Sequence, residues 1–180
     1  SLIEEGSPIL SAPRFYGDLV EAVLATTDCD IVLKLHPWER RKPDLQRPLT
    51  RELLERRLAA LPDGLRARVS LCEHAPMQAL VETADHFVTI CSQSGIEAAV
   101  AGLRPVTLGR TFYSGYGFTT TCADLEAVVA AIASGDGRLD MAGQGGFEDF
   151  LVALDREAVP SSQGGAAIVT RRLHWVAPPE

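Results

Sequence analysis

A lysine and a histidine stand two positions apart at the end of an apolar run. The run Ile31 to Leu35 has the composition of a strand, and it is followed by His36 and Pro37, where proline cannot continue a central ladder. An imidazole at a strand end can donate to a phosphate oxygen or assist a leaving group, and Lys34 adds a positive charge. The alternative is a structural histidine whose hydrogen bonds are already satisfied, and the motif alone leaves both open.

A second candidate is the polar turn Ser92-Gln93-Ser94-Gly95, which follows another apolar run and precedes a helical pattern. It offers hydroxyls, an amide and a backbone that tolerates close approach, and the first N–H groups of a helix attract phosphate or carboxylate. Glu97 can hold ribose hydroxyls. The alternative is helix capping, because Ser94 and Glu97 have the spacing of a Ser-x-x-Glu capping box. A capped helix start can still present its N–H groups, so the two interpretations are compatible.

The third candidate is a loop of aromatic residues and glycines that runs to Thr121. Phe112, Tyr113, Gly117 and Thr119 lie in it, and such a loop suits contact with a ring or a sugar. The alternative is a surface loop that packs its own aromatic side chains together.

Alternating apolar patterns predict the elements that position these motifs. Strands are expected at 31–35, 68–72, 86–90 and 104–108, and helices at 15–26, 50–61, 76–84, 96–101, 125–133 and 147–158. Strands that alternate with helices predict an α/β fold, a Rossmann-like parallel sheet flanked by helices. Ligands of such sheets bind beyond the carboxyl ends of the strands, where all three motifs fall. A single site is therefore expected.

The pattern divides the chain into three parts. Residues 1–13 are expected to be an irregular lead-in, because they contain Pro8 and Pro13 and show no periodicity. Residues 14–158 are expected to form a single Rossmann-like lobe. Residues 159–180 are a C-terminal segment in which a last helix, at 165–175, would pack back on the lobe.

Composition excludes several classes of protein. The net charge is −7 and no long basic run occurs, which argues against nucleic acid as a partner. No apolar stretch approaches the roughly 20 residues of a membrane span. Cys29, Cys72, Cys91 and Cys122 lack paired metal spacing, so we expect free thiols and no metal site. A cytoplasmic location is expected, with the inner face of the membrane as an alternative.

Taken together, the motifs resemble the capsule polysaccharide biosynthesis family, whose members include Kdo transferases that use CMP-Kdo. The matching residues are 31–37, 88–98, 104–109, 112–113 and 117–119. The resemblance covers roughly residues 15 to 121, and the order and spacing of the motifs make it more specific than any one of them. The His-Pro pair is also similar to the His-Pro motif of bacterial sialyltransferases. Phe118 departs mildly from the family pattern, where leucine is commoner.

The resemblance implies a GT-B glycosyltransferase, in which two Rossmann-like lobes face a cleft and the C-terminal lobe holds the donor nucleotide. This chain resembles that C-terminal lobe, so residues 14–158 would be a Rossmann-like nucleotide-sugar-binding lobe. His36 would then be the catalytic residue that contacts the CMP phosphate. The other implied contacts are to the phosphate cradle or ribose (Lys34, Pro37, Ser92, Gln93, Ser94, Gly95, Glu97) and to the donor sugar or base (Phe112, Tyr113, Gly117, Thr119).

The same resemblance implies the partners. They are a CMP-activated acidic sugar, a glycan or glycolipid acceptor, and an N-terminal lobe that supplies the catalytic carboxylate; no cofactor and no metal are expected. We also expect that this chain alone transfers nothing. Two alternatives stay open: a non-catalytic nucleotide-binding or assembly module, and a GT-B lobe specific for a UDP-sugar or an epimerase relative.

Overall fold

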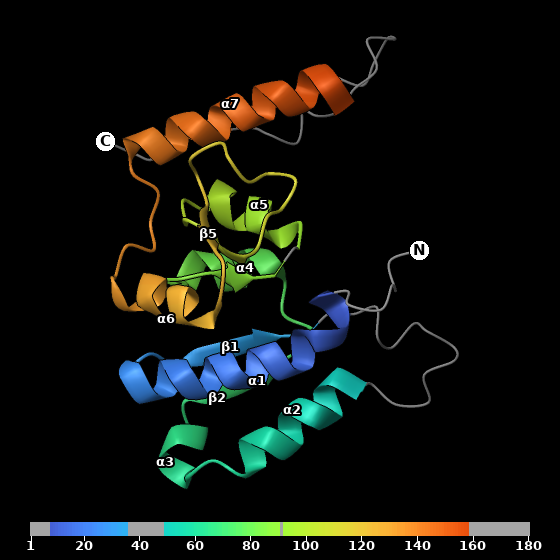
Figure 1. Cartoon of the computed structure of the whole chain (residues 1–180), viewed down its shortest axis with the longest axis vertical. Coiled ribbons are helices and arrows are strands. Elements are labelled where there is room, and N and C mark those ends of the chain that lie inside the picture. The colour runs from blue at the N-terminus through green and yellow to red at the C-terminus, as the bar shows by residue number, and fades with distance from the viewer. Residues whose placement is uncertain (1–7, 36–48, 91, 159–180) are drawn as a thin grey trace.

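The computed structural model describes residues 8–35, 49–90 and 92–158 (Figure 1). Two residues of the first motif, His36 and Pro37, lie outside the described residues, and so does the helix expected at 165–175.

The described residues contain five strands in two sheets, and every pairing is parallel. Strand β1 (Ile31–Lys34) pairs with β2 (Val69–Cys72), while β4 (Val106–Leu108) lies between β3 (Val88–Thr89) and β5 (Thr120–Cys122). Parallel neighbours need a crossover connection, which helices supply except between β4 and β5. The expected Rossmann-like α/β fold, short parallel sheets flanked by helices, is confirmed.

Helices flank both sheets. Helix α1 crosses the middle of the molecule between α6 and α2, and α7 lies across the end of the three-stranded half (Figure 1). The helices of the described residues are α1 (Pro8–Thr26), α2 (Leu49–Ala59), α3 (Asp63–Arg66), α4 (Met77–Thr83), α5 (Ser94–Val100), α6 (Leu125–Ala133) and α7 (Met141–Ala158).

The core passes from one sheet to the other through α1. Leu19 and Val23 pack in one cluster with Val106 of β4 and with α6. Val20 and Leu24, one position further along the helix, pack in a second cluster with α2 and the two-stranded sheet. Residues four apart lie on one helical face, so these adjacent stripes let a single helix cover both sheets.

The side chain of Arg68 caps the C-terminal end of α1. The guanidinium of Arg68 donates from Nη2 to the carbonyl oxygens of Thr27 (2.6 Å) and Cys29 (2.7 Å), and its Nη1 lies 3.5 Å from the carbonyl oxygen of Leu24. The last carbonyls of a helix have no partner within it, and a cation there also complements the helix dipole. Arg68 precedes β2, so it fastens the end of α1 to the start of that strand.

Several elements differ from the sequence prediction, and the short helix α3 was not predicted. Helix α1 begins at Pro8, so residues 8–13 are helical rather than irregular; proline is well tolerated in a first turn, and Pro13 costs one backbone bond. Helix α7 begins at Met141, six residues before the helix expected at 147–158. Strand β5 lies within the stretch expected to be a loop.

The thiols of the described residues follow the expectation. Cys29, Cys72 and Cys122 are free, whereas Cys91 lies outside the described residues. Burial raises the pKa of the Cys122 thiol, and the nearby Asp124 raises it further, so this thiol is neutral at physiological pH. Within residues 8–35, 49–90 and 92–158, no helix has the length and apolar character to cross a membrane.

Candidate functional site

Hydrogen bonds to side-chain hydroxyl groups hold the polar turn after β3 together. The backbone N–H of Ser92 donates to Thr89 Oγ1 (3.2 Å), and the hydroxyl of Ser92 accepts from both the N–H (3.2 Å) and the hydroxyl (2.7 Å) of Ser94. Thr89 is a buried polar residue at the end of β3. It was missed from sequence, where it looked like one more member of an apolar run.

Ser94 and Glu97 do not form the capping box that was the alternative interpretation of this turn. Helix α5 begins at Ser94 itself, its N-cap position is Gln93, and no side chain caps it. Ser94 therefore stands inside the first turn, where its hydroxyl reaches back to Ser92 instead of forward along the helix. Glu97 is exposed and makes no side-chain hydrogen bond to the described residues, so capping does not occupy it.

Tyr113 joins the turn to the aromatic loop. Its hydroxyl donates to the carbonyl oxygen of Ser92 (2.7 Å), and its side chain is fully buried. A Cβ added at Gly95 would overlap this hydroxyl, which explains why the smallest residue stands at that position. The ring was expected on the donor side, but it lies in the core and supports the turn from beneath.

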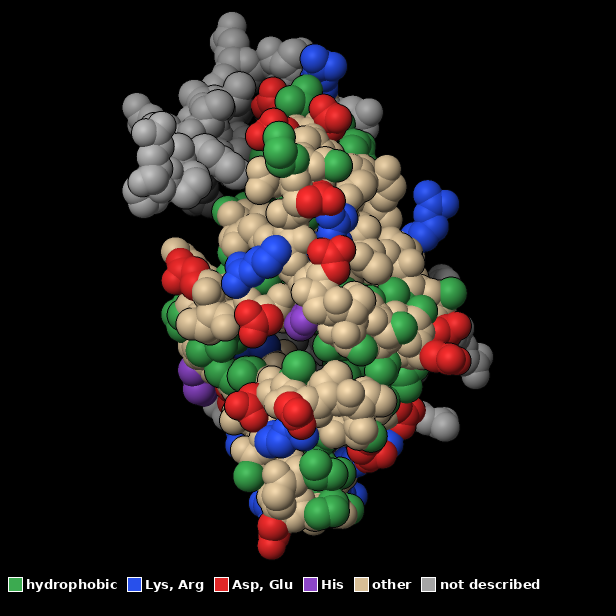
Figure 2. All heavy atoms as spheres, turned by 90° about the vertical axis from the view of Figure 1, so that its left-hand side faces the viewer, with side chains coloured by type: hydrophobic (Ala, Val, Ile, Leu, Met, Phe, Trp, Pro, Cys, Tyr) green, Lys and Arg blue, Asp and Glu red, His purple; other side chains and the backbone are tan. Residues whose placement is uncertain are grey.

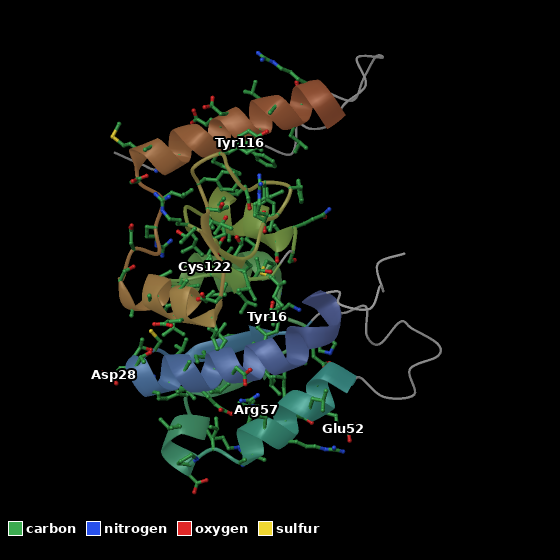
Figure 3. All side chains as sticks on the ribbon, in the orientation of Figure 1. Tyr16, Asp28, Glu52, Arg57, Tyr116 and Cys122 are labelled. Atoms are coloured by element: carbon green, nitrogen blue, oxygen red, sulfur yellow. The ribbon has the colours of Figure 1, made fainter. Side chains whose placement is uncertain are left out.

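The other rings of the loop divide between core and surface. Phe118 is fully buried against Phe147 of α7, with ring centroids 5.0 Å apart, whereas Phe112 remains 57% exposed. Tyr116 lies between these extremes at 36%, beneath α7 (Figure 3). The alternative of a loop that packs its own rings therefore holds for Tyr113 and Phe118, whereas Phe112 stays accessible.

Two further residues of the loop were predicted to lie on the donor side. Gly117 has a φ of 85°, a conformation that strains any residue with a side chain, and its carbonyl oxygen accepts a hydrogen bond from Arg104. Thr119 is half-buried beside the start of β5.

A network of hydroxyls lies between β4, β5 and the loop. Ser114 Oγ accepts from the Thr111 N–H (2.9 Å) and lies 2.9 Å from its hydroxyl, and Thr121 Oγ1 bridges Ser114 to Thr107 at 3.4 Å on each side. The sequence motifs did not single out these residues. The available signal was the density of Ser and Thr between 107 and 121, but which hydroxyls meet depends on how the loop folds back.

Lys34, the candidate cation of the first motif, is held at the end of the two-stranded sheet. Lys34 Nζ donates to the carbonyl oxygen of Glu73 and lies 3.4 Å from that of Leu35. Arg51 Nη1 donates to Glu73 Oε1 at 2.5 Å, and the carboxylate side chain is only 15% exposed. In the structure this ion pair fastens α2 to the end of β2.

The structure thus brings together some of the expected residues. Ser92, Ser94, Gly95 and Tyr113 form one connected group. Lys34 belongs to the other sheet, and no hydrogen bond within the described residues links it to that group.

On the face shown in Figure 2, the described Lys and Arg side chains are scattered among acidic ones and form no continuous basic surface. Across the described ranges, no group of three or more His, Cys, Asp or Glu side chains is placed to hold a metal ion.

Comparison with known proteins found one family. The family model described as capsule polysaccharide biosynthesis protein matches residues 3–130, which include the turn, the aromatic loop and all five strands. No curated protein and no solved structure matches the chain.

Proposed function

The chain belongs to the capsule polysaccharide biosynthesis family, and from this membership we propose that it is the donor-nucleotide-binding lobe of a GT-B glycosyltransferase. We propose CMP-Kdo as the donor and a bacterial surface polysaccharide or glycolipid as the acceptor. Membership itself supports the broader role, in surface polysaccharide synthesis. The matched residues, 3–130, contain the turn after β3, the aromatic loop and all five strands, whereas α7 lies beyond them.

The observation that supports the proposal most directly is the junction at Tyr113. It joins the turn after β3 to the loop after β4, and both follow the carboxyl ends of neighbouring parallel strands. Ligands of parallel α/β sheets bind at this edge. Because the junction is buried and hydrogen-bonded, the turn is held in one conformation before a ligand arrives, which lowers the entropic cost of binding.

The proposed roles follow from what each group can donate or accept. The hydroxyls and backbone N–H groups of the 92–95 turn would hold phosphate oxygens, and Glu97, which is exposed and caps no helix, would accept from ribose hydroxyls. Phe112 would lie against the base or sugar, since its ring is the most exposed in the loop. Tyr113 would support the turn from the core.

In the transfer reaction, the bond from the sugar to the CMP phosphate breaks and negative charge develops on that phosphate. Hydrogen-bond donors already aimed at the phosphate stabilise this charge. We propose that His36 is one such donor and that the positive charge of Lys34, held at the end of β1, adds to the field. The carboxylate that acts on the sugar and the acceptor surface are assigned to a second lobe, and no metal or cofactor is invoked.

The first test is a thermal-shift panel with CMP, UDP and GDP. A ligand at a hundredfold excess over its dissociation constant stabilises the folded state by about 2.7 kcal/mol. We expect CMP to raise the melting temperature and UDP and GDP to leave it unchanged. A response to UDP alone would replace CMP-Kdo by a UDP-sugar, and no response to any nucleotide would overturn the proposed function.

The role of His36 is tested by substitution. We expect His36→Ala to weaken CMP binding by about 1.5–3 kcal/mol, the contribution of a charge-assisted hydrogen bond. Cytidine has no phosphate, so its affinity should hardly change. Equal losses for CMP and cytidine would show that His36 is structural.

A further inference from the structure

Helix α7 lies beyond the residues that match the family, yet it contacts the aromatic loop along two of its turns. Phe147 packs edge-on against Phe118 at 5.0 Å, and Phe150 packs edge-on against Tyr116 at 5.3 Å. A Cβ added at Gly146 would overlap the carbonyl oxygen of Tyr116, so the helix backbone touches the loop backbone directly. The loop therefore has α7 as one of its walls.

Arg104 connects the loop to the beginning of this helix. Its Nη1 donates to the carbonyl oxygen of Gly117 (3.0 Å), and its Nη2 donates to Oδ1 of Asp140 (2.8 Å). The side chain is 15% exposed, and its Nε is buried without a partner among the described residues. Two of the three guanidinium nitrogens thus face partners that are far apart in the chain.

Asp140 links Arg104 to the first turn of α7. The same Oδ1 that accepts from Arg104 also accepts from the backbone N–H of Gly143 (2.7 Å). The Gly143 N–H, and then Arg104, hold the pKa of Asp140 below its ordinary value, so the carboxylate is ionised at neutral pH. A hydrogen-bonded path therefore runs from Gly117 of the loop through Arg104 to the start of the helix.

We propose that Arg104 is a positioning residue for the donor site, and this inference rests on the proposed function. By holding Gly117 against α7, Arg104 fixes the loop that carries both Phe112 and Tyr113. Because Tyr113 is hydrogen-bonded to Ser92, a displacement of the loop also displaces the phosphate turn. Arg104 therefore acts on the nucleotide through the loop, without touching it, and α7 becomes part of the site.

Two conservative variants test this. Arg104→Lys keeps the charge but loses the planar fork that reaches two acceptors at once. Asp140→Asn removes the charge, while asparagine remains a good residue at the start of a helix. We expect each to weaken CMP binding about tenfold, near the lower end of what a charge-assisted hydrogen bond contributes.

Arg138→Lys is the matched control. Arg138 lies on the same connection before α7, and its Nη2 also donates to a backbone carbonyl, that of Ala84 (3.1 Å), away from the loop. The control should leave CMP affinity unchanged. An equal loss of affinity in all three variants would reflect general destabilisation and overturn the proposal.

A second measurement needs no nucleotide. Chymotrypsin cleaves after aromatic residues, and Phe112 and Tyr116 are the exposed rings of the loop. Under native conditions we expect several-fold faster cleavage at these residues in Arg104→Lys and Asp140→Asn, and the wild-type rate in Arg138→Lys. The free energy of unfolding, measured in urea for each variant, corrects for cleavage through global unfolding.

The two measurements separate the possible outcomes. Faster loop cleavage with weaker CMP binding supports the proposal. Unchanged cleavage overturns the anchoring, and faster cleavage with unchanged CMP affinity overturns the positioning role. If the unaltered chain binds no nucleotide, the proposed function fails, while faster cleavage in the two variants would still support Arg104 as the anchor of the loop.

Discussion

The half of the molecule around β1 and β2 is fastened by charged side chains, whereas the half around β3, β4 and β5 is fastened by buried rings and glycines. In the first half, Arg57 of α2 reaches α1, where it contacts Asp18 (2.6 Å) and Glu21 (2.6 Å) (Figure 3). Arg68 donates to a carbonyl group just after α1, and Arg51 forms an ion pair with Glu73. These contacts lie at or near the surface.

In the second half, glycine backbone and buried rings make the corresponding contacts. Gly95 admits the hydroxyl of Tyr113, and Gly146 admits the carbonyl of Tyr116. Phe118 fills the space between the loop and α7 and is fully buried. Arg104 and Arg138 are exceptions, charged side chains that donate to backbone carbonyl groups within the aromatic half.

The difference indicates how each half responds to change. Exposed ion pairs contribute little and weaken with salt, and their long side chains can move aside. A closely packed interior leaves no such freedom, because one added methyl group must displace backbone. We infer that the turn and the loop of the candidate site belong to the less adaptable half, while Lys34 belongs to the more adaptable one.

The sharpest test of this comparison places a methyl group in α7. Gly146→Ala should lower the free energy of unfolding by about 1–3 kcal/mol, because the new Cβ meets the Tyr116 backbone. Gly145→Ala is the matched control: it lies in the same helix with open space around it, and should raise stability by about 0.5–1 kcal/mol. Urea denaturation measures both. Similar stabilisation by both changes would mean that α7 does not press on the loop.

Removing the hydroxyl group of Tyr113 should have a smaller effect on stability. Tyr113→Phe removes the hydrogen bond to Ser92 and should cost about 0.5–1.5 kcal/mol. Tyr116→Phe is the control, because Tyr116 is 36% exposed and its hydroxyl makes no hydrogen bond to the described residues, so its change should stay within about 0.5 kcal/mol. Hydrogen exchange should also speed up at the amides of the 92–95 turn in Tyr113→Phe only. Equal costs for the two variants would remove Tyr113 as the link between turn and loop.

The smallest effect should come from the charged half. Arg57→Gln should cost about 0.2–1 kcal/mol at low salt, and the difference from wild type should shrink in 1 M salt, where the Debye length is about 3 Å. Arg66→Gln, on the exposed helix α3, serves as the control and should be neutral under both conditions. A cost that is large and independent of salt would show that Arg57 acts through packing, and the contrast between the halves would weaken.

Much of the framework could be predicted from local patterns. Helix α6 begins and ends where its apolar pattern does, and Asp124 caps it by accepting from the N–H of Ala127. Strands β1 and β2 lie within one residue of their expected bounds, because β-branched and leucine runs bounded by turns carry that information locally. The polar motifs of the turn and the aromatic loop were also visible, as was their place after strands.

The elements that sequence missed depend on partners rather than on local preference. Strand β5 is short and rich in threonine, and it becomes a strand because β4 offers it a ladder. The glycines of α7 disfavour a helix by themselves, but at Gly146 they allow the contact with Tyr116. Intrinsic propensity is a weak prior, and tertiary contact overrode it in both places.

By itself, the sequence determined the class of fold, the parallel order of strands and helices, and the membership of a family, since these depend on periodicity and on motifs within short windows. Only the tertiary structure decided that Tyr113 lies inside the molecule, that the Ser94 hydroxyl donates to Ser92 rather than capping α5, and that Arg104 faces both the loop and α7. These hydrogen bonds of Tyr113 and Arg104 join residues separated by more than ten positions, and a side chain's partners at that range are set by how the elements pack.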